Sequence, residues 1–122
     1  MTRGPHGQTV DQLVERFAEI GVAQSEALDA DEHAKFNRLY DQMDMIGNEL
    51  RSRGTVARLA LLGLYDHPNM QVRLIAAKRT LAVAPERARQ ALEAIENSKC
   101  YPQAMDAGMC LINLDRGIFK PT

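Results

Sequence analysis

The sequence contains no tryptophan, and only 5% of its residues are aromatic. Proteins that flip bases or bind single-stranded nucleic acid stack aromatic side chains on the bases. Because aromatic residues are scarce in this sequence, neither function is expected. The formal net charge is only -1, from 15 Lys and Arg against 16 Asp and Glu, whereas nucleic-acid-binding domains are clearly basic. A nucleic-acid partner is therefore not expected.

Long apolar segments are absent as well. The longest unbroken apolar run, Leu59–Tyr65, has about seven residues, whereas a membrane-spanning helix needs roughly 18. The first residues, MTRGPHGQ, have no apolar stretch behind Arg3, so no secretion signal is expected. The sequence thus predicts a cytoplasmic protein without a membrane partner.

Residues typical of metal sites and of catalysis are few and scattered. None of His6, His33 and His67 stands four residues from another histidine or within an H-E-x-x-H frame. If Cys100 and Cys110 bracket one helix, their separation of about 15 Å is too long for a disulfide. No glycine-rich phosphate loop and no nucleophile motif occurs. We expect no metal, no cofactor and no enzymatic activity.

Helical periodicity, by contrast, runs through almost the whole sequence. Ala, Leu, Glu, Arg and Gln dominate, and apolar residues never alternate with polar ones over the length of a strand, which predicts an all-α protein. Residues 1–8 have nothing to bury and are predicted to form a disordered tail. One domain of about six helices is predicted over residues 9–122, as three helical hairpins at 9–54, 55–84 and 85–117.

Local signals mark the ends of these helices. Thr9 and Gln12 form a capping box at the start of the first helix. Three further helices are predicted to begin at the capping residues Asp31, Thr55 and Asn69. Gly54 suits the positive φ that follows a helix end. Pro85 and Pro102 each suit the first position of a helix.

The segment HPNMQVRLIAAKRTL, which begins at His67, carries the most specific pattern. It is similar to the HEAT repeat, in which a turn of Asp-Pro-Asp type precedes a helix containing Val-Arg-x-x-Ala-Ala-x-x-x-Leu. The resemblance places Asn69 in the turn and Arg73 at the repeat's arginine, with Arg73 expected to bind loop carbonyls or Asp66. It places four residues in the core of the repeat: Val72, Ala76, Ala77 and Leu81.

A second, degenerate copy follows at a period of roughly 32 residues, from Gln71 to Gln103. Gly108 or Ala107 replaces the alanine pair, Met105 stands at the arginine position, and the apolar positions come from Leu111, Ile112 and Leu114. The DHP-N-QVR-AAK, NRLYD and DAGM segments also resemble a bacterial family of small proteins described as a domain of unknown function. Both resemblances imply a short right-handed α-α superhelix, and neither implies an activity.

Charge is distributed unevenly along the chain. Residues up to Asp66 include seven basic and eleven acidic side chains, whereas those from His67 onward include eight basic and five acidic ones. One interpretation is a basic patch that steers an acidic partner. Its basic residues are Arg73, Lys78, Arg79, Arg87 and Arg89. The other is a solvated surface on which the arginines pair locally with Glu86 and Glu93.

The fourth helix carries the predicted binding residues. Because Val72, Ala76 and Leu81 face the core, Gln71 and Lys78 are expected to point to solvent, with Arg79 at the rim. We expect a protein–protein interaction module, such as an adaptor, a regulator or an immunity-type protein. Its expected partner is another protein, and acidic proteins are among the candidates. The alternative is a nucleic-acid-binding HEAT-like protein that uses the basic patch around Lys78.

Overall fold

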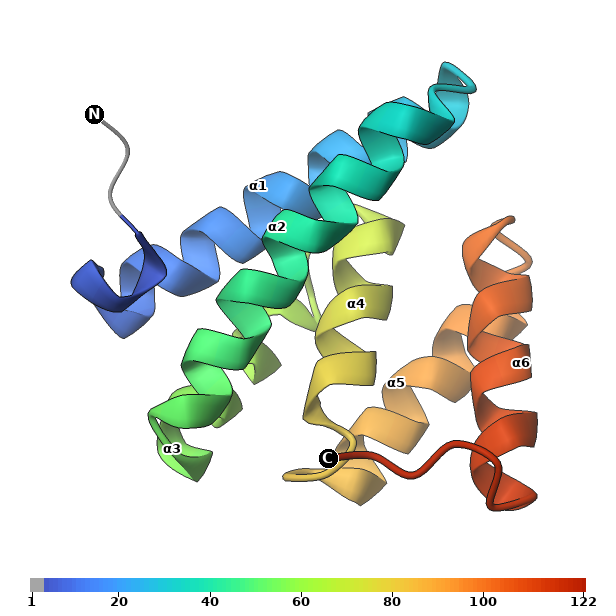
Figure 1. Ribbon diagram of the computed structural model, residues 1–122. Helices are drawn as coiled ribbons and strands as arrows, with labels where there is room; N and C mark the ends of the chain where they lie inside the picture. Colours follow the sequence, from blue (N-terminus) through green and yellow to red (C-terminus); the bar gives the residue numbers. More distant parts are fainter. Residues whose placement is uncertain (1–3) are drawn as a thin grey trace. The chain divides into compact units, whose positions relative to one another are not determined.

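The computed structural model describes residues 4–122 (Figure 1). Within this range the chain forms six α-helices and no strand, which confirms the all-α class. The helices follow one another with short connections, because capping residues, glycines and prolines end each periodic segment. Their bounds are α1 Val10–Asp29, α2 His33–Ser52, α3 Thr55–Leu59, α4 Met70–Thr80, α5 Pro85–Asn97 and α6 Gln103–Asp115.

The chain divides into two compact units, one ending at Ala60 and the other comprising Leu61–Thr122. The sequence predicted one domain over 9–122 with a hairpin boundary near residue 55. The observed boundary falls inside the predicted third helix. That segment is split into the five-residue α3 and a 3-10 helix, Ala60–Leu64, so it is no continuous helix.

The N-terminal unit is built on the α1–α2 hairpin. The predicted capping box is present, since Thr9 Oγ1 accepts from Gln12 N–H and Gln12 Oε1 accepts from Thr9 N–H. One apolar stripe on each helix is buried, as the three- and four-residue spacing predicts. The buried apolar residues of the two helices are Leu13, Phe17, Ile20, Ala27, Met43, Ile46 and Leu50.

Two predicted capping residues occupy other roles. Asp31 has φ 59°, so it makes the left-handed turn between α1 and α2, and Glu32 takes the N-cap position instead. Aspartate tolerates this conformation better than most residues. Gly54, with φ 102°, ends α2 as predicted but also serves as the N-cap of α3, so Thr55 is the first helical residue. Likewise, Pro102 is the N-cap of α6 and not its first residue.

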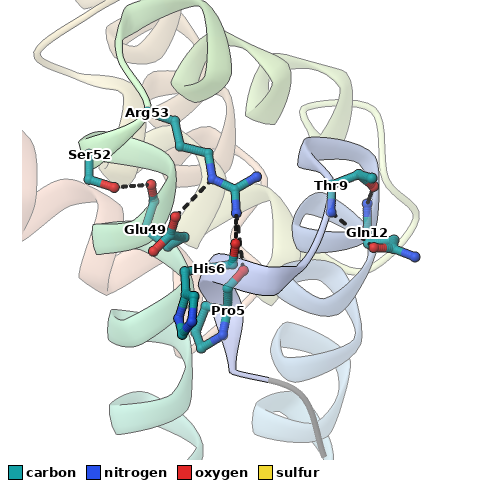
Figure 2. A network of polar contacts seen from close by, with 7 residues as sticks. All are labelled: Pro5, His6, Thr9, Gln12, Glu49, Ser52 and Arg53. Atoms are coloured by element: carbon teal, nitrogen blue, oxygen red, sulfur yellow. Dashed lines mark hydrogen bonds and ion pairs between the residues drawn. The ribbon is translucent and has the colours of Figure 1, made fainter.

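The segment predicted as a disordered tail is partly ordered. Pro5–Gly7 form one turn of 3-10 helix, so the prediction is wrong for these residues, while Met1–Arg3 lie outside the described residues. Figure 2 shows the reason: Arg53 Nη2 donates to the carbonyl oxygens of Pro5 (3.2 Å) and His6 (3.1 Å). Arg53 Nε is held by the Glu49 carboxylate at 2.8 Å. A contact across 47 or 48 residues leaves no local pattern in the sequence.

The C-terminal unit consists of α4, α5 and α6, drawn from yellow to red in Figure 1. All three helices contribute to one apolar cluster, in which alanines alternate with larger side chains so that the helices approach closely. Its buried members are Leu74, Ala77, Leu81, Ala88, Leu92, Ile95, Ala107, Cys110 and Leu111.

Candidate functional site

The turn before α4 is fixed by side chains of the HEAT-like segment. Asn69 Oδ1 accepts from the backbone N–H groups of Gln71 (2.9 Å) and Val72 (3.2 Å), so Asn69 is the N-cap that the sequence predicts. Arg73 Nε donates to the carbonyl oxygen of His67, which is the backbone alternative expected for this arginine. The His67 ring also accepts from Asn69 N–H, at 3.0 Å. These polar groups therefore stabilise the turn.

The four residues that the repeat pattern places in the core are all buried. Val72, Ala76 and Ala77 have no exposed surface, and Leu81 is almost completely covered. Ala77 and Leu81 belong to the cluster with α5 and α6. The small side chain of Ala77 thus lies where these helices pack on α4.

Gln71 is not on the surface, contrary to the prediction. Its side chain is buried between α4 and α6, and its Oε1 accepts from Gln103 Nε2 at 3.0 Å. Gln103 is buried as well. The two amides satisfy each other away from water, which is why polar residues are tolerated at these positions.

Lys78 is partly exposed and lies beside α6. Its Nζ forms an ion pair with Asp106 Oδ1 of α6 at 3.0 Å. Arg89 of α5 pairs in the same way with Asp115 at the other end of α6. Two of the basic side chains of the predicted patch are thus balanced by carboxylates of α6 and not by the local Glu86 and Glu93. Arg79, the third predicted binding residue, is half-buried.

The outward face of α6 carries an exposed apolar row that the sequence analysis missed. Met105, Met109 and Ile112 follow one another at spacings of four and three residues, which places them on one side of the helix. Their exposed fractions are 64%, 53% and 45%. Tyr101, in the turn before α6, is 61% exposed. We call Met105, Met109 and Ile112 the α6 row. Exposed apolar side chains are ordinary when scattered, but a contiguous row on one helix is typical of an interaction site.

The opposite side of α6 explains why the row was missed. Ala104, Ala107, Cys110 and Leu111 are buried, so α6 is apolar on both sides. The sequence analysis placed Ile112 with the core residues, but the structure leaves it on the surface. A helix that is apolar on two opposite sides normally has neighbours on both sides. This second apolar side of α6 was the signal in the sequence that could have revealed the row.

A shallow depression lies between α4 and α5. It has a volume of about 90 Å³ and is lined by apolar atoms together with Arg73, Ser98 and Tyr65. Small-molecule sites usually enclose about 300–1,000 Å³, so this one does not fit a cofactor. Burial raises the pKa of Tyr65 above its usual value, although the hydrogen bond to Thr80 and the charge of Arg87 act in the opposite direction.

The cysteines are free thiols in different surroundings. Cys100 is exposed, whereas Cys110 is buried in the cluster. Burial raises the pKa of Cys110, the nearby Lys78 lowers it and Asp106 raises it, so this thiol is protonated near neutral pH. Among residues 4–122, no three His, Cys, Asp or Glu side chains gather as a metal site would require. No helix in the same range has the length and apolar character needed to cross a membrane.

The chain was compared with known families and structures. Residues 11–115 match a family described as a domain of unknown function, DUF2019. The crystal structure of the protein RPA1889 from Rhodopseudomonas palustris CGA009 is similar, with 52% sequence identity and a TM-score of 0.95. That likeness covers 99% of this chain and 100% of the other. No protein with a curated description matches.

Proposed function

The chain belongs to the DUF2019 family, a domain of unknown function, and we propose that it is a non-enzymatic protein–protein interaction module that binds its partner through the α6 row. The proposal depends on one observation. The α6 row lies on the face of α6 that corresponds to the face of α4 on which the next helical hairpin packs.

Helices α4 and α6 correspond when the sequence is shifted by 32 residues. Gln71 and Gln103 are 32 residues apart and bind each other, as equivalent positions on neighbouring helices do in a repeat array. The same shift relates Val72 to Ala104 and Ala76 to Gly108, all of them buried. This correspondence supports the interpretation of α4 and α6 as the second helices of two HEAT-like hairpins.

The shift also relates the exposed methionines to residues of α4 that contact α5. Arg73 lines the depression together with Ala91 and Ile95 of α5, and Ala77 lies in the shared cluster. Their equivalents on α6 are Met105 and Met109, both more than half exposed. On α4, this face is covered by a helical hairpin. On α6, the equivalent face is apolar and open.

The chemistry of the α6 row fits a protein partner. An apolar helix face that is open to solvent favours contact with a further protein element. Methionine is flexible and polarizable, and it is used at surfaces that adapt to a partner. The neighbouring Tyr101 is of a residue type enriched in interface cores. The row lies on an exposed side of a helix, which fits a contact with a protein better than an enclosed small-molecule site.

The charge pattern gives little support to the nucleic-acid alternative. Phosphate binding relies on unpaired Lys and Arg side chains that release counterions from the backbone. Here Lys78 and Arg89 are each engaged by a carboxylate of α6. A protein partner therefore explains the surface better than DNA or RNA does.

Site-specific photocrosslinking in the native host tests the proposal. A photoreactive amino acid at Met109 is expected to give a discrete covalent adduct with another protein, because this position lies inside the contact. The matched control is the same amino acid at Met45 of α2, whose exposed fraction of 56% is close to the 53% of Met109. Mass spectrometry of the adduct identifies the partner.

Binding of the purified partner then gives the decisive comparison. Met109→Glu is expected to weaken binding by about 100-fold, because a carboxylate would be buried without a counterion, whereas Met45→Glu leaves the affinity unchanged. Equal adducts from both positions, or equal affinities of both variants, would remove the α6 row from the interface.

A further inference from the structure

We infer that a second copy of this chain covers the α6 row when no other partner is bound, with the two α6 helices packed antiparallel about a two-fold axis that passes between Met105 and Met109. This inference rests on the proposed function, because it assigns an occupant to the same surface. It adds regulation: self-association hides the binding face until a partner displaces the second copy.

The row is close to symmetric about its middle. Met105 and Met109 lie two residues before and two residues after position 107, and Ile112 follows one turn after Met109. In an antiparallel pair centred at that level, Met105 of one copy faces Met109 of the other, twice. A two-fold interface requires such self-complementarity.

The edges of the row are complementary in charge to a second copy. At 3.6 residues per turn, Asp106 and Asp115 stand on opposite sides of the row. Asp106 is paired with Lys78 and Asp115 with Arg89, so each edge contains one positive and one negative side chain. Within each of these pairs the two charges cancel.

A two-fold axis sets like edges of the two copies against each other. Asp106 is one residue from the level of the proposed axis, so the Asp106–Lys78 pairs of the two copies come together there. Two positive and two negative side chains then meet at this edge. A strongly acidic or strongly basic partner would instead face one like charge on each edge, which costs affinity. The charge balance therefore favours a second copy over a strongly charged protein.

The size of the contact predicts a weak dimer. α6 has 13 residues, so the helix is about 20 Å long. One helix from each copy buries less surface than the roughly 1,600 Å² of a standard stable interface. We therefore expect a dissociation constant in the micromolar range, which allows the second copy to exchange with another partner.

Sedimentation velocity between about 1 µM and about 500 µM tests the inference. Wild-type protein is expected to pass from monomer to dimer over this range, and Met45→Glu to behave in the same way. Met109→Glu is expected to raise the dissociation constant by at least about 30-fold, because two-fold symmetry places the new carboxylate in the contact twice. Both side chains are exposed, and unchanged circular dichroism spectra verify that both variants fold.

Disulfide trapping tests the antiparallel register. In a Cys100→Ser background, a mixture of the Met105→Cys and Met109→Cys variants is expected to form intermolecular disulfides faster than either variant alone, because these positions face each other. Equal rates in the mixture and in the separate variants would overturn the arrangement.

Two outcomes of the sedimentation experiment would overturn the inference itself: wild-type protein that stays monomeric throughout, or a dimer that survives Met109→Glu. The proposed function fails in a different way, through the absence of a specific adduct with another protein at Met109. The two failures are therefore separable.

Discussion

Ala77→Leu is expected to lower the free energy of unfolding by about 1–3 kcal/mol, because the larger side chain overpacks a closed cluster. Ala77 has no exposed surface and shares its cluster with Leu92 of α5 and Ala107 of α6. Three added carbon atoms have no space there, so α5 and α6 must move away from α4. The sequence pattern placed Ala77 in the core of the repeat, and the structure packs it against the two helices that follow.

Chemical denaturation measures this loss, with Ala34→Leu as the matched control. Ala34 is exposed in the first turn of α2, so the same substitution there is expected to change the stability by less than about 0.5 kcal/mol. If Ala77→Leu were as stable as the wild type, the close approach of α5 and α6 to α4 would be wrong.

Gln103→Leu is expected to destabilise the protein by about 1–3 kcal/mol, because it removes the donor that Gln71 Oε1 accepts from in a buried position. Leucine has a similar volume, so the loss reflects hydrogen bonding more than packing. Gln90→Leu on α5 is the control, since Gln90 is exposed and its replacement leaves no buried polar atom without its bond.

A double-mutant cycle isolates the contribution of this amide pair. Gln71→Leu combined with Gln103→Leu is expected to cost less than the sum of the two single replacements, because neither polar group then remains in the core. Strict additivity of the two losses would show that the amides do not depend on each other, and would also weaken the correspondence between α4 and α6.

Local features of the fold could be predicted from the sequence. The capping box of Thr9 and Gln12, the N-cap Asn69 and the positive φ of Gly54 each depend on residues within one turn of the chain, and the structure contains all three. The amphipathic stripes of α1 and α2 follow equally from residue spacing, since a 3.6-residue period fixes which side chains share a face.

Features that depend on distant residues could not be predicted. Gln71 was assigned to solvent because Val72, Ala76 and Leu81 were expected to face the core, but its environment is set by Gln103 on another helix. Pro5–Gly7 were assigned to a disordered tail because their anchor, Arg53, is far away in the sequence.

The exposure of the α6 row could not be predicted from the sequence either. Periodicity alone cannot distinguish an apolar face that is covered by a neighbouring helix from one that is open. Met109 and Leu111 are both apolar and two residues apart, yet Leu111 is buried and Met109 is about half exposed. The neighbours of the helix, which local pattern does not specify, decide the difference.

The most direct test of the proposed binding surface is nuclear magnetic resonance of methyl-labelled methionines while the partner found by crosslinking is added. The methyl signals of Met105 and Met109 are expected to shift or broaden in step with binding, because both side chains enter the contact. The signal of Met45, equally exposed on α2, is expected to stay unchanged. A partner that binds while perturbing Met45 and leaving Met105 and Met109 unaffected would contradict the account.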